Sequence, residues 1–360
     1  MKEEDPISSD QTTVIPRKEK NPERESSAEI TFAGWERYLV SDFLGQGATS
    51  KVFKAIDPLL NRKVALKFIL EIDSGTEKRF IREARAQAQI EHPNICKIHE
   101  VGTFSGKHYI AMQFIEGETL GVAAEKMSIE QRVFAMHRVA EAVHAAHRIG
   151  IIHRDLKPSN IMVERTDAGW NPYVLDFGLA RETATEGATI TGLVFGTPAF
   201  MPPEQAWGDA EKLDRRSDVY SLGATLYYIL TRRAPYVGNT MEVIVQLSQS
   251  EPLPVRKLSP EIPRDLETIV MKCLERKPDR RYDSAKAFAE DLERYLNGDS
   301  IQAQPVTWAY KLRKKIQKNK TVAAVLAAST LIAAILGGVG LFSWWRAGQQ
   351  VKVAREFAQT

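Results

Sequence analysis

A stretch of 25 residues without a charged side chain, residues 321–345, places the strongest constraint on how this chain folds. It reads TVAAVLAASTLIAAILGGVGLFSWW. As a helix it reaches roughly 37 Å, against a bilayer hydrocarbon core of about 30 Å. The alternative is a buried core helix, but such helices rarely stay free of charge for so long, so the pattern predicts a single transmembrane helix.

The charges on either side of this stretch predict its orientation. Basic residues favour the cytoplasmic flank of a membrane helix. Residues 298–320 are therefore predicted to form a cytoplasmic basic juxtamembrane linker and residues 346–360 an extracytoplasmic tail, which places the protein in the cell membrane, with its N-terminus inside and its C-terminus outside. The flanking basic residues are Lys311, Arg313, Lys314, Lys315, Lys318 and Lys320 before the stretch, and Arg346, Lys352 and Arg355 after it.

Small residues within the stretch permit two such helices to approach closely. Ala333 and Gly337, and likewise Ala334 and Gly338, are four residues apart. This spacing is compatible with a homodimer, although small residues are also simply frequent in membrane helices.

The averages of the whole chain describe a soluble globular protein, with 43% hydrophobic and 26% charged residues among 360. A net charge of +3 is too small to favour nucleic acid as a partner. The two cysteines, Cys96 and Cys273, are far apart and support neither a disulfide framework nor a structural zinc site. Residues 1–34 are polar and rich in charge, so a disordered tail is expected there, and the segment has no apolar core of a secretory signal.

Between these segments the pattern changes from strands to helices. Short apolar runs broken by Gly, Pro and Asn predict strands at 38–43, 50–56, 63–69 and 108–114, with one long helix at 76–91. Helical spacing then predicts helices at 129–147, 218–230, 265–274 and 284–296. The fold class is therefore α+β, with a small antiparallel β lobe that carries one helix, followed by a larger, mainly helical lobe.

Two features of the β lobe suggest phosphate binding. The turn after residue 43 reads LGQGATSKV, and glycines let backbone N–H groups approach phosphate oxygens, although tight hairpins also use Gly-x-Gly. Lys67 closes an apolar strand, where an ammonium group requires an anionic partner. Glu83 in the predicted helix is a candidate, and the alternative is an ordinary surface ion pair.

A polar cluster in the helical lobe supplies the groups that phosphoryl transfer needs. The chain reads HRDLKPSN at 153–160 and DFG at 176–178. Asp155 can accept a proton from an alcohol, and Lys157 can stabilise a transferring phosphoryl group. Asn160 and Asp176 offer the hard oxygens that Mg²⁺ prefers.

Taken in order, these motifs resemble those of the eukaryotic-type Ser/Thr protein kinase family, including its bacterial membrane-anchored members. GTPAFMPPE at 196–204 and SDVYSLG at 217–223 complete the set. The resemblance covers residues 38–296 and implies a bilobal protein kinase fold. It implies a catalytic domain at 35–297, with an N-lobe at 35–115 and a C-lobe at 116–297.

The resemblance implies that the cofactors are ATP and Mg²⁺, with two metal ions and with Mn²⁺ as a substitute. Lys67 would pair with ATP phosphates and with Glu83, Met112 would be the gatekeeper, and Gln113 and Ile115 would present hinge backbone groups to adenine. The residues implied to contact ATP are Leu44, Gly45, Gln46, Gly47, Ala48, Thr49, Ser50, Lys51, Val52, Ala65, Lys67, Met112, Gln113 and Ile115.

The resemblance also implies the catalytic roles. Asp155 would orient the substrate hydroxyl and accept its proton, Lys157 would stabilise the γ-phosphoryl group, and Asn160 and Asp176 would hold the metal ions. Lys157 and Thr197 match the Ser/Thr form of the family, so Ser and Thr hydroxyls of proteins would be the acceptors.

Other matches concern regulation and structure. Arg154 beside the catalytic aspartate implies a basic site for a phosphate on the activation loop, with Thr191 and then Thr189 as candidates for autophosphorylation, although both also fit as ordinary loop threonines. Glu204 and Arg281 match a buried ion pair, and Asp218 matches an anchor for the catalytic loop. Ser50 replaces a glycine and Pro202 an alanine of the usual motifs, without removing a chemical group.

Two other functions fit parts of this pattern. A catalytically inactive membrane scaffold, or pseudokinase, would usually lack the lysine, the base or a metal ligand, and all are present here. A small-molecule kinase of related fold would lack the segments at 196–204 and 217–223. The sequence therefore favours an active kinase of protein substrates.

Overall fold

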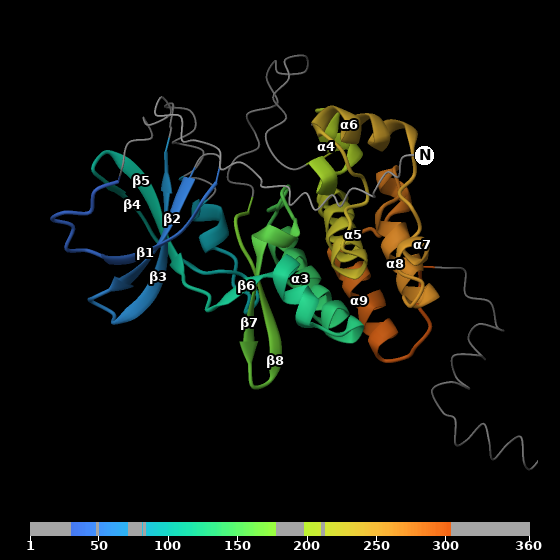
Figure 1. Cartoon of the computed structure of the whole chain (residues 1–360), viewed down its shortest axis with the longest axis horizontal. Helices are drawn as coiled ribbons and strands as arrows, with labels where there is room; N and C mark the ends of the chain where they lie inside the picture. The colour runs from blue at the N-terminus through green and yellow to red at the C-terminus, as the bar shows by residue number, and fades with distance from the viewer. Residues whose placement is uncertain are drawn as a thin grey trace, which may run out of the picture.

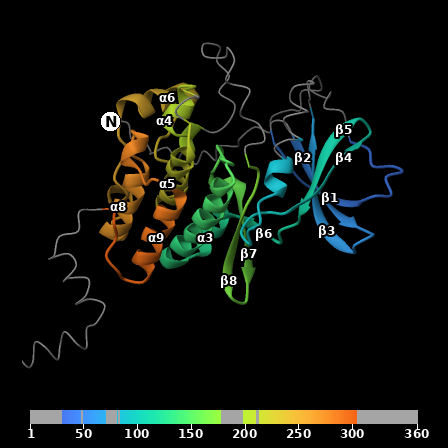
Figure 2. The same cartoon turned by 180° about the vertical axis from the view of Figure 1, so that it is seen from behind.

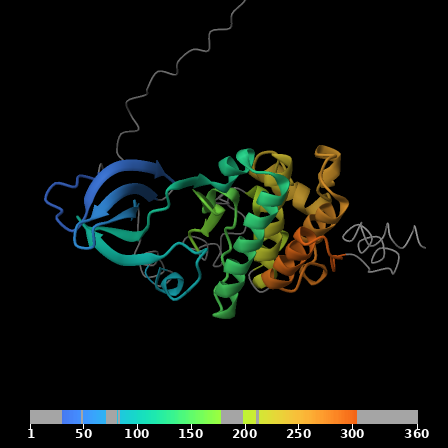
Figure 3. The ribbon, with the colours of Figure 1, turned by 90° about the horizontal axis from the view of Figure 1, so that it is seen from below.

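The computed structural model describes residues 30–47, 50–70, 81, 84–177, 198–209 and 213–303. These residues form two lobes that lie end to end (Figures 1 and 3). The β-rich lobe comes first in the chain and the helical lobe second. This is the bilobal arrangement that the order of strand and helix patterns predicts.

The small lobe is a five-stranded antiparallel sheet in the order β1-β2-β3-β5-β4. Two shifts of register, between Val40 and Asp42 and between Phe43 and Gly45, bend the edge strand β1 against β2. The strands are β1 (Leu39–Gln46), β2 (Ser50–Asp57), β3 (Arg62–Ile69), β4 (Ile98–Phe104) and β5 (Lys107–Gln113). The four predicted strands are confirmed, and β4 is an addition.

β4 escapes prediction because polar residues interrupt its apolar pattern. Glu100 lies in the middle of the strand and accepts hydrogen bonds from Arg37 (2.8 Å), Tyr38 (2.9 Å) and Tyr109 (2.5 Å). The carboxylate is thus satisfied by partners that are distant in the sequence. A half-buried glutamate of this kind cannot be distinguished from a loop residue by its local pattern.

The long helix of the small lobe is only partly within the described residues. Ile81 and residues 84–88 are helical, and a turn follows at Gln89. The helix therefore ends before residue 91, ahead of the His92–Pro93 step, because proline disfavours a helical conformation in the residue before it.

The helical lobe is built around α5 (Arg215–Thr231), in which most side chains are buried. Helix α3 begins at a capping box in which Ser128 and Gln131 exchange side-chain and backbone hydrogen bonds. The helices around α5 are α2 (Leu120–Ala123), α3 (Ile129–Arg148), α4 (Pro203–Ala206), α6 (Thr240–Gln249), α7 (Val255–Leu258), α8 (Arg264–Cys273) and α9 (Ala285–Leu296). The four predicted helices are confirmed, and α2, α4, α6 and α7 are additions.

A small second sheet lies between the strands of the first lobe and α3, as Figure 2 shows from behind. It consists of β6 (Gly117–Thr119), β7 (Ile161–Thr166) and β8 (Gly169–Val174), all antiparallel. This sheet is not among the elements predicted from the sequence. Its importance is positional, because the chain enters β7 directly after the polar 153–160 segment and leaves β8 just before Asp176.

The start of the folded domain lies earlier than the sequence predicts. Phe32 and Trp35 pack with their ring centroids 5.9 Å apart, and Phe32 also meets the edge of Phe53 at 4.9 Å. Trp35 stacks on Phe104 at 4.4 Å. Ile30 packs against the same core cluster. The predicted boundary of the tail at residue 34 is therefore wrong, because Ile30 and Phe32 pack against the core of the small lobe.

The other end of the domain also extends beyond its predicted limit at residue 297. Ile301 is fully buried, and the backbone N–H of Gln302 donates to Asp291 of α9 at 2.7 Å. Residues 298–302 thus belong to the helical lobe rather than to a free linker. In the part of the chain that the structure describes, no helix is both apolar and long enough to cross a membrane. The predicted span at 321–345 lies outside the described residues.

Replacing Phe32 by alanine should reveal how much residues 30–34 contribute to the stability of the domain. We expect Phe32→Ala to lower the free energy of unfolding by about 2 kcal/mol, because the ring is half buried among aromatic neighbours. Urea unfolding measures this value. Leu59→Ala removes a side chain that is 79% exposed and should change stability by less than about 0.5 kcal/mol. Equal effects of the two changes would contradict the packing of residue 32.

Candidate functional site

The start of the segment 153–160 is anchored to the helical lobe by the buried carboxylate of Asp218. Asp218, in the first turn of α5, is completely buried and accepts hydrogen bonds from the backbone N–H groups of His153 and Arg154, both at 2.8 Å. Arg154 has φ of 63°, in the left-handed region. A non-glycine residue is held in this conformation only by strong local contacts, which Asp218 provides.

Asp218 has a third partner, His147, at the end of α3. The Nε2 atom of His147 donates to its Oδ2 atom at 2.7 Å, and both side chains are buried. Burial alone raises the pKa of the Asp218 carboxyl, but the hydrogen bonds and positive potential from His147 and His153 outweigh it, so the pKa lies below its ordinary value. The carboxylate therefore stays charged and keeps its three donors.

Within the segment 153–160, the side chains of Lys157 and Asn160 both contact one carboxylate oxygen of Asp155. Lys157 Nζ lies 2.9 Å from Asp155 Oδ2. The amide nitrogen of Asn160 donates to the same oxygen at 3.0 Å and to the backbone carbonyl of Asp155 at 2.8 Å. The Asp155 carboxylate is thus oriented by two side-chain donors while it remains partly open to solvent, 26% exposed.

The aspartate that follows β8 is placed beside this group. Asp176 Oδ2 pairs with Lys67 Nζ of β3 at 2.7 Å, which brings a residue of each lobe together. The carbonyl of Asn160 accepts the backbone N–H of Leu175 at 2.9 Å, which fixes the distance between the two polar segments. Phe177 is buried, and its ring lies 4.6 Å from that of His153.

The described residues expected to contact ATP lie on β1, β2, β3 and β5 of the small sheet or directly after β5. Val52 of β2 lies opposite Lys67 of β3, and Ala65 of β3 lies opposite Met112 of β5. The backbone N–H of Gly47 donates to Ser50 at 2.8 Å and closes the turn after β1. The strand β5 ends at Gln113, whose N–H donates to Lys97 at 2.8 Å. Leu44, Gly45, Gln46 and Lys51 lie on β1 and β2, and Ile115 follows β5.

Some predicted site residues lie outside the described residues. They are Ala48, Thr49, Glu83, Thr189, Thr191 and Thr197.

Glu204 and Arg281 form a bidentate pair inside the helical lobe. The two contacts measure 2.7 and 2.9 Å, and both side chains are almost fully buried. Ser217 of α5 donates a further hydrogen bond to Glu204 at 2.8 Å. Removing one member of a buried pair leaves the other charge uncompensated, so the pair fixes the segment 202–205 to the lobe.

The comparisons with known proteins agree with this geometry. Residues 38–292 match the family model of the protein kinase domain. The chain belongs to the protein kinase family. It is 38% identical over 283 residues to serine/threonine-protein kinase PknB of Mycobacterium leprae, a match that covers 75% of this chain and 45% of PknB. The chain thus spans less than half the length of the curated relatives it matches.

Solved kinase structures share the fold. The kinase domain of Mycobacterium tuberculosis PknI has 25% sequence identity and a TM-score of 0.57, covering 75% of this chain and 98% of that one. Rad53 in complex with AMP-PNP has 25% identity and a TM-score of 0.59, covering 72% of this chain and 65% of that one. The bilobal fold of a protein kinase is therefore established for this chain.

Three residues of the kinase site were missed by the sequence analysis. His147 precedes Asp155 by eight residues and donates to Asp218, and Gln205 donates to the carbonyl of Arg154 at 2.9 Å. Gln87 joins the helix of the small lobe to Phe177. The first two give no signal in the sequence alone. Gln87 lies one helical turn after Glu83, and that spacing was available as a signal.

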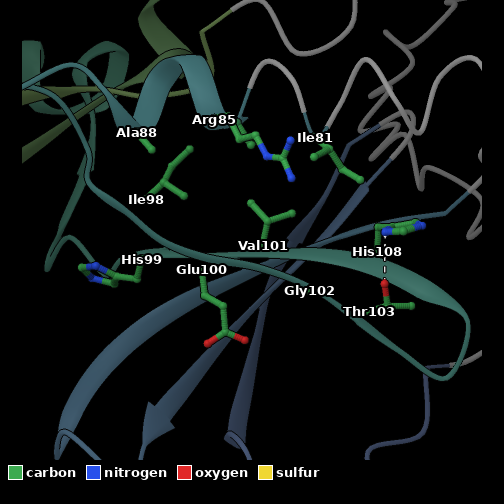
Figure 4. Close-up of a pocket in the computed structure, with 11 residues that line it drawn as sticks. Ile81, Arg85, Ala88, Ile98, His99, Glu100, Val101, Gly102, Thr103 and His108 are labelled. Atoms are coloured by element: carbon green, nitrogen blue, oxygen red, sulfur yellow. Dashed lines mark hydrogen bonds between the residues drawn. The ribbon is translucent and has the colours of Figure 1, made fainter.

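A cavity of about 390 Å³ lies elsewhere in the kinase small lobe. Figure 4 shows Ile81, Arg85 and Ala88 on one side of it and Ile98 and Val101 of β4 on the other. None of the residues expected to contact ATP or metal lines it. It is therefore separate from the candidate active site.

Proposed function

We propose that this chain is a Ser/Thr protein kinase that transfers the γ-phosphoryl group of Mg-ATP to hydroxyl groups of proteins. The observation that carries the proposal is the convergence of Asp155, Lys157 and Asn160, with Asp176 held beside them by Lys67. Family membership and the Ser/Thr kinase names of relatives such as PknB support it.

The nucleotide would lie between the lobes, under β1 and β2. Val52 and Ala65 supply apolar contacts for adenine, and the backbone of Gln113 and Ile115 supplies its hydrogen-bond partners. Lys67 is 14% exposed, so its ammonium is available to the α- and β-phosphates while it stays paired with Asp176. Rad53, a solved structure of similar fold, was determined in complex with AMP-PNP, which supports nucleotide binding by this chain.

The residues of the site fit a magnesium ion. The amide nitrogen of Asn160 is turned toward Asp155, so its other polar atom, a carbonyl oxygen, faces away from the base. Asp176 is 30% exposed and uses one oxygen for Lys67. Groups of three or more His, Cys, Asp or Glu are absent from the described residues, which is consistent with ions held by two protein ligands together with phosphates and water. When bound, Mg²⁺, or Mn²⁺ in its place, neutralises charge on the phosphates.

The side chains of the 153–160 segment would then act on the acceptor. Asp155 orients the substrate hydroxyl and accepts its proton as the oxygen forms a bond to the γ-phosphorus and the bond to ADP breaks. Lys157 stabilises the negative charge on the phosphoryl group in the transition state of its transfer. The hydrogen bond from Asn160 keeps the accepting oxygen of Asp155 in place.

Replacing the base tests the function directly. We expect Asp155→Asn to lower the rate of phosphoryl transfer to a basic protein substrate by about 10²-fold or more, because an amide cannot accept the proton. Transfer of label from γ-labelled ATP measures the rate. Asp167→Asn, in the exposed turn between β7 and β8, should leave the rate unchanged. If the unmodified folded chain transfers no more label than Asp155→Asn does, the proposal is wrong.

We propose that the kinase is activated by autophosphorylation of Thr191 or Thr189. Arg154, next to the catalytic base, provides the cation that a phosphate on the loop would bind. We expect Thr191→Ala to lower the transfer rate about tenfold, and more than Thr189→Ala does. Mass spectrometry of the chain after incubation with ATP should detect phosphate on this loop. A matched change, Ser248→Ala on α6, should have no effect, and absence of label at both threonines would contradict the proposal.

We also propose that residues 321–345 anchor the kinase in the cell membrane, with the catalytic domain in the cytoplasm and with pairing of the helices into a homodimer. The support is the charge-free run and the excess of basic residues before it. The chain leaves the helical lobe at residues 301–303, packed against α9, only a short distance in sequence from this run.

Two arginines in the middle of the run should release the protein from membranes. Each costs about 2.5–3.5 kcal/mol in the centre of a bilayer. We expect the unmodified chain to stay with membranes after alkaline carbonate extraction, and the double variant Leu331→Arg, Leu336→Arg to be extracted. Leu59→Arg, in the exposed turn after β2, is the control and should remain bound. Extraction of the unmodified chain would contradict the anchor.

A further inference from the structure

The side chain of Gln87 bridges the helix of the small lobe and the segment that carries Asp176. Its amide nitrogen donates to the carbonyl of Cys96 at 3.2 Å, and its amide oxygen accepts the backbone N–H of Phe177 at 3.3 Å. We propose that Gln87 is a positioning residue that holds Asp176 in its active orientation through the backbone of Phe177. The inference rests on the proposed kinase function and extends it to a residue that touches neither nucleotide nor metal.

Burial makes this bridge selective for an amide. Gln87 is 4% exposed, so a group at this position cannot exchange its hydrogen bonds for bonds to water. The carbonyl of Cys96 requires a donor and the N–H of Phe177 requires an acceptor. A glutamine supplies both at once, whereas an apolar side chain supplies neither and leaves two buried backbone groups without this partner.

The bridge ends on a junction that is already rigid. The backbone N–H of Cys96 donates to Val174 at 3.0 Å, and the N–H of Val174 donates to Asn94 at 2.8 Å. Asn94 is itself fully buried and donates from its side chain to the carbonyl of Pro172 at 2.7 Å. The loop before β4 is thus joined to the end of β8, and Gln87 adds the helix to the same junction.

Asp176 needs such support because its backbone is in the left-handed region, with φ of 52°. A non-glycine residue adopts this conformation only when its surroundings hold it there. The N–H of Leu175 before it donates to Asn160, and the N–H of Phe177 after it donates to Gln87. The bond to Gln87 fixes the peptide group that directly follows Asp176, and the bond to Asn160 fixes the peptide group between Val174 and Leu175, one residue earlier in the chain.

The consequence for the reaction is specific. If the bond to Phe177 is lost, Asp176 is free to rotate away from Lys67 and from the metal, while the substrate-binding surfaces of the helical lobe stay unchanged. The defect should therefore appear in the maximal rate and in the Mg²⁺ requirement, and not in the affinity for the protein substrate.

The test compares Gln87→Met with Gln87→Glu in the full chain. Methionine has a similar length and removes both hydrogen bonds, whereas glutamate keeps the acceptor for Phe177. We expect Gln87→Met to lower kcat about 3- to 30-fold and to raise the Mg²⁺ concentration for half-maximal rate, with an unchanged KM for the protein substrate. Gln87→Glu should retain more activity than Gln87→Met.

A matched control and a second measurement separate the possible outcomes. Gln246→Met removes an amide that donates to the carbonyl of Val237 at 2.9 Å, far from the site, and should leave kcat and the Mg²⁺ requirement unchanged. Hydrogen exchange at the Phe177 amide needs no activity and should be faster in Gln87→Met than in the unmodified chain. This measurement tests the bridge even if the unmodified chain proves inactive, a result that would overturn the proposed function alone. Unchanged or increased kcat in Gln87→Met with unchanged exchange would overturn the role of Gln87.

Discussion

The buried carboxylate of Asp218 is the contact on which the geometry of the site depends. It accepts two backbone N–H groups of the 153–154 segment and the imidazole of His147, so one side chain joins α5, the end of α3 and the catalytic segment. A charged group without exposure to water is tolerated only when its oxygens are satisfied in this way. The neighbouring left-handed residue Arg154 is held by the same contact, and this sets the direction in which Asp155 leaves the backbone.

Two contacts among the described residues join the lobes at the position of Asp176. The ion pair of Lys67 and Asp176 joins β3 to the segment after β8, and the amide of Gln87 joins the helix to the same segment. These contacts end on the adjacent residues Asp176 and Phe177, so both bear on the position of Asp176. Asp155, the expected catalytic base, is oriented by Lys157 and Asn160 from within the helical lobe.

Regular patterns and polar clusters could be predicted from the sequence, whereas contacts between distant segments could not. The strands with clear apolar runs and the long helices α3, α5, α8 and α9 were found, because their periodicity is local. β4 was missed since Glu100 finds its partners at positions 37, 38 and 109. The tail was extended to residue 34 because Ile30 and Phe32 are isolated apolar residues in a polar segment, and only the fold shows that they meet an aromatic face.

The same distinction applies to the site. Asp155, Lys157, Asn160 and Asp176 carry recognisable chemistry and stand in short motifs, so the sequence identified them. His147 and Gln205 each reach the site through one hydrogen bond, and Gln87 reaches it through its bond to Phe177; these partners lie tens of residues away, and the residue types are common on any helix. The roles of His147 and Gln205 follow only from their hydrogen-bond partners in the fold, whereas the spacing of Gln87 from Glu83 was a signal in the sequence.

The bent edge of the small sheet has a consequence for how copies of the domain meet each other. β1 is an edge strand, and its side chains Leu39, Phe43 and Leu44 are exposed, which would make a flat strand a template for pairing with its counterpart in another molecule. The two register shifts along β1 interrupt its row of free backbone groups. The irregularities that shape the strand expected to cover the nucleotide thus also protect the domain against aggregation through its own edge.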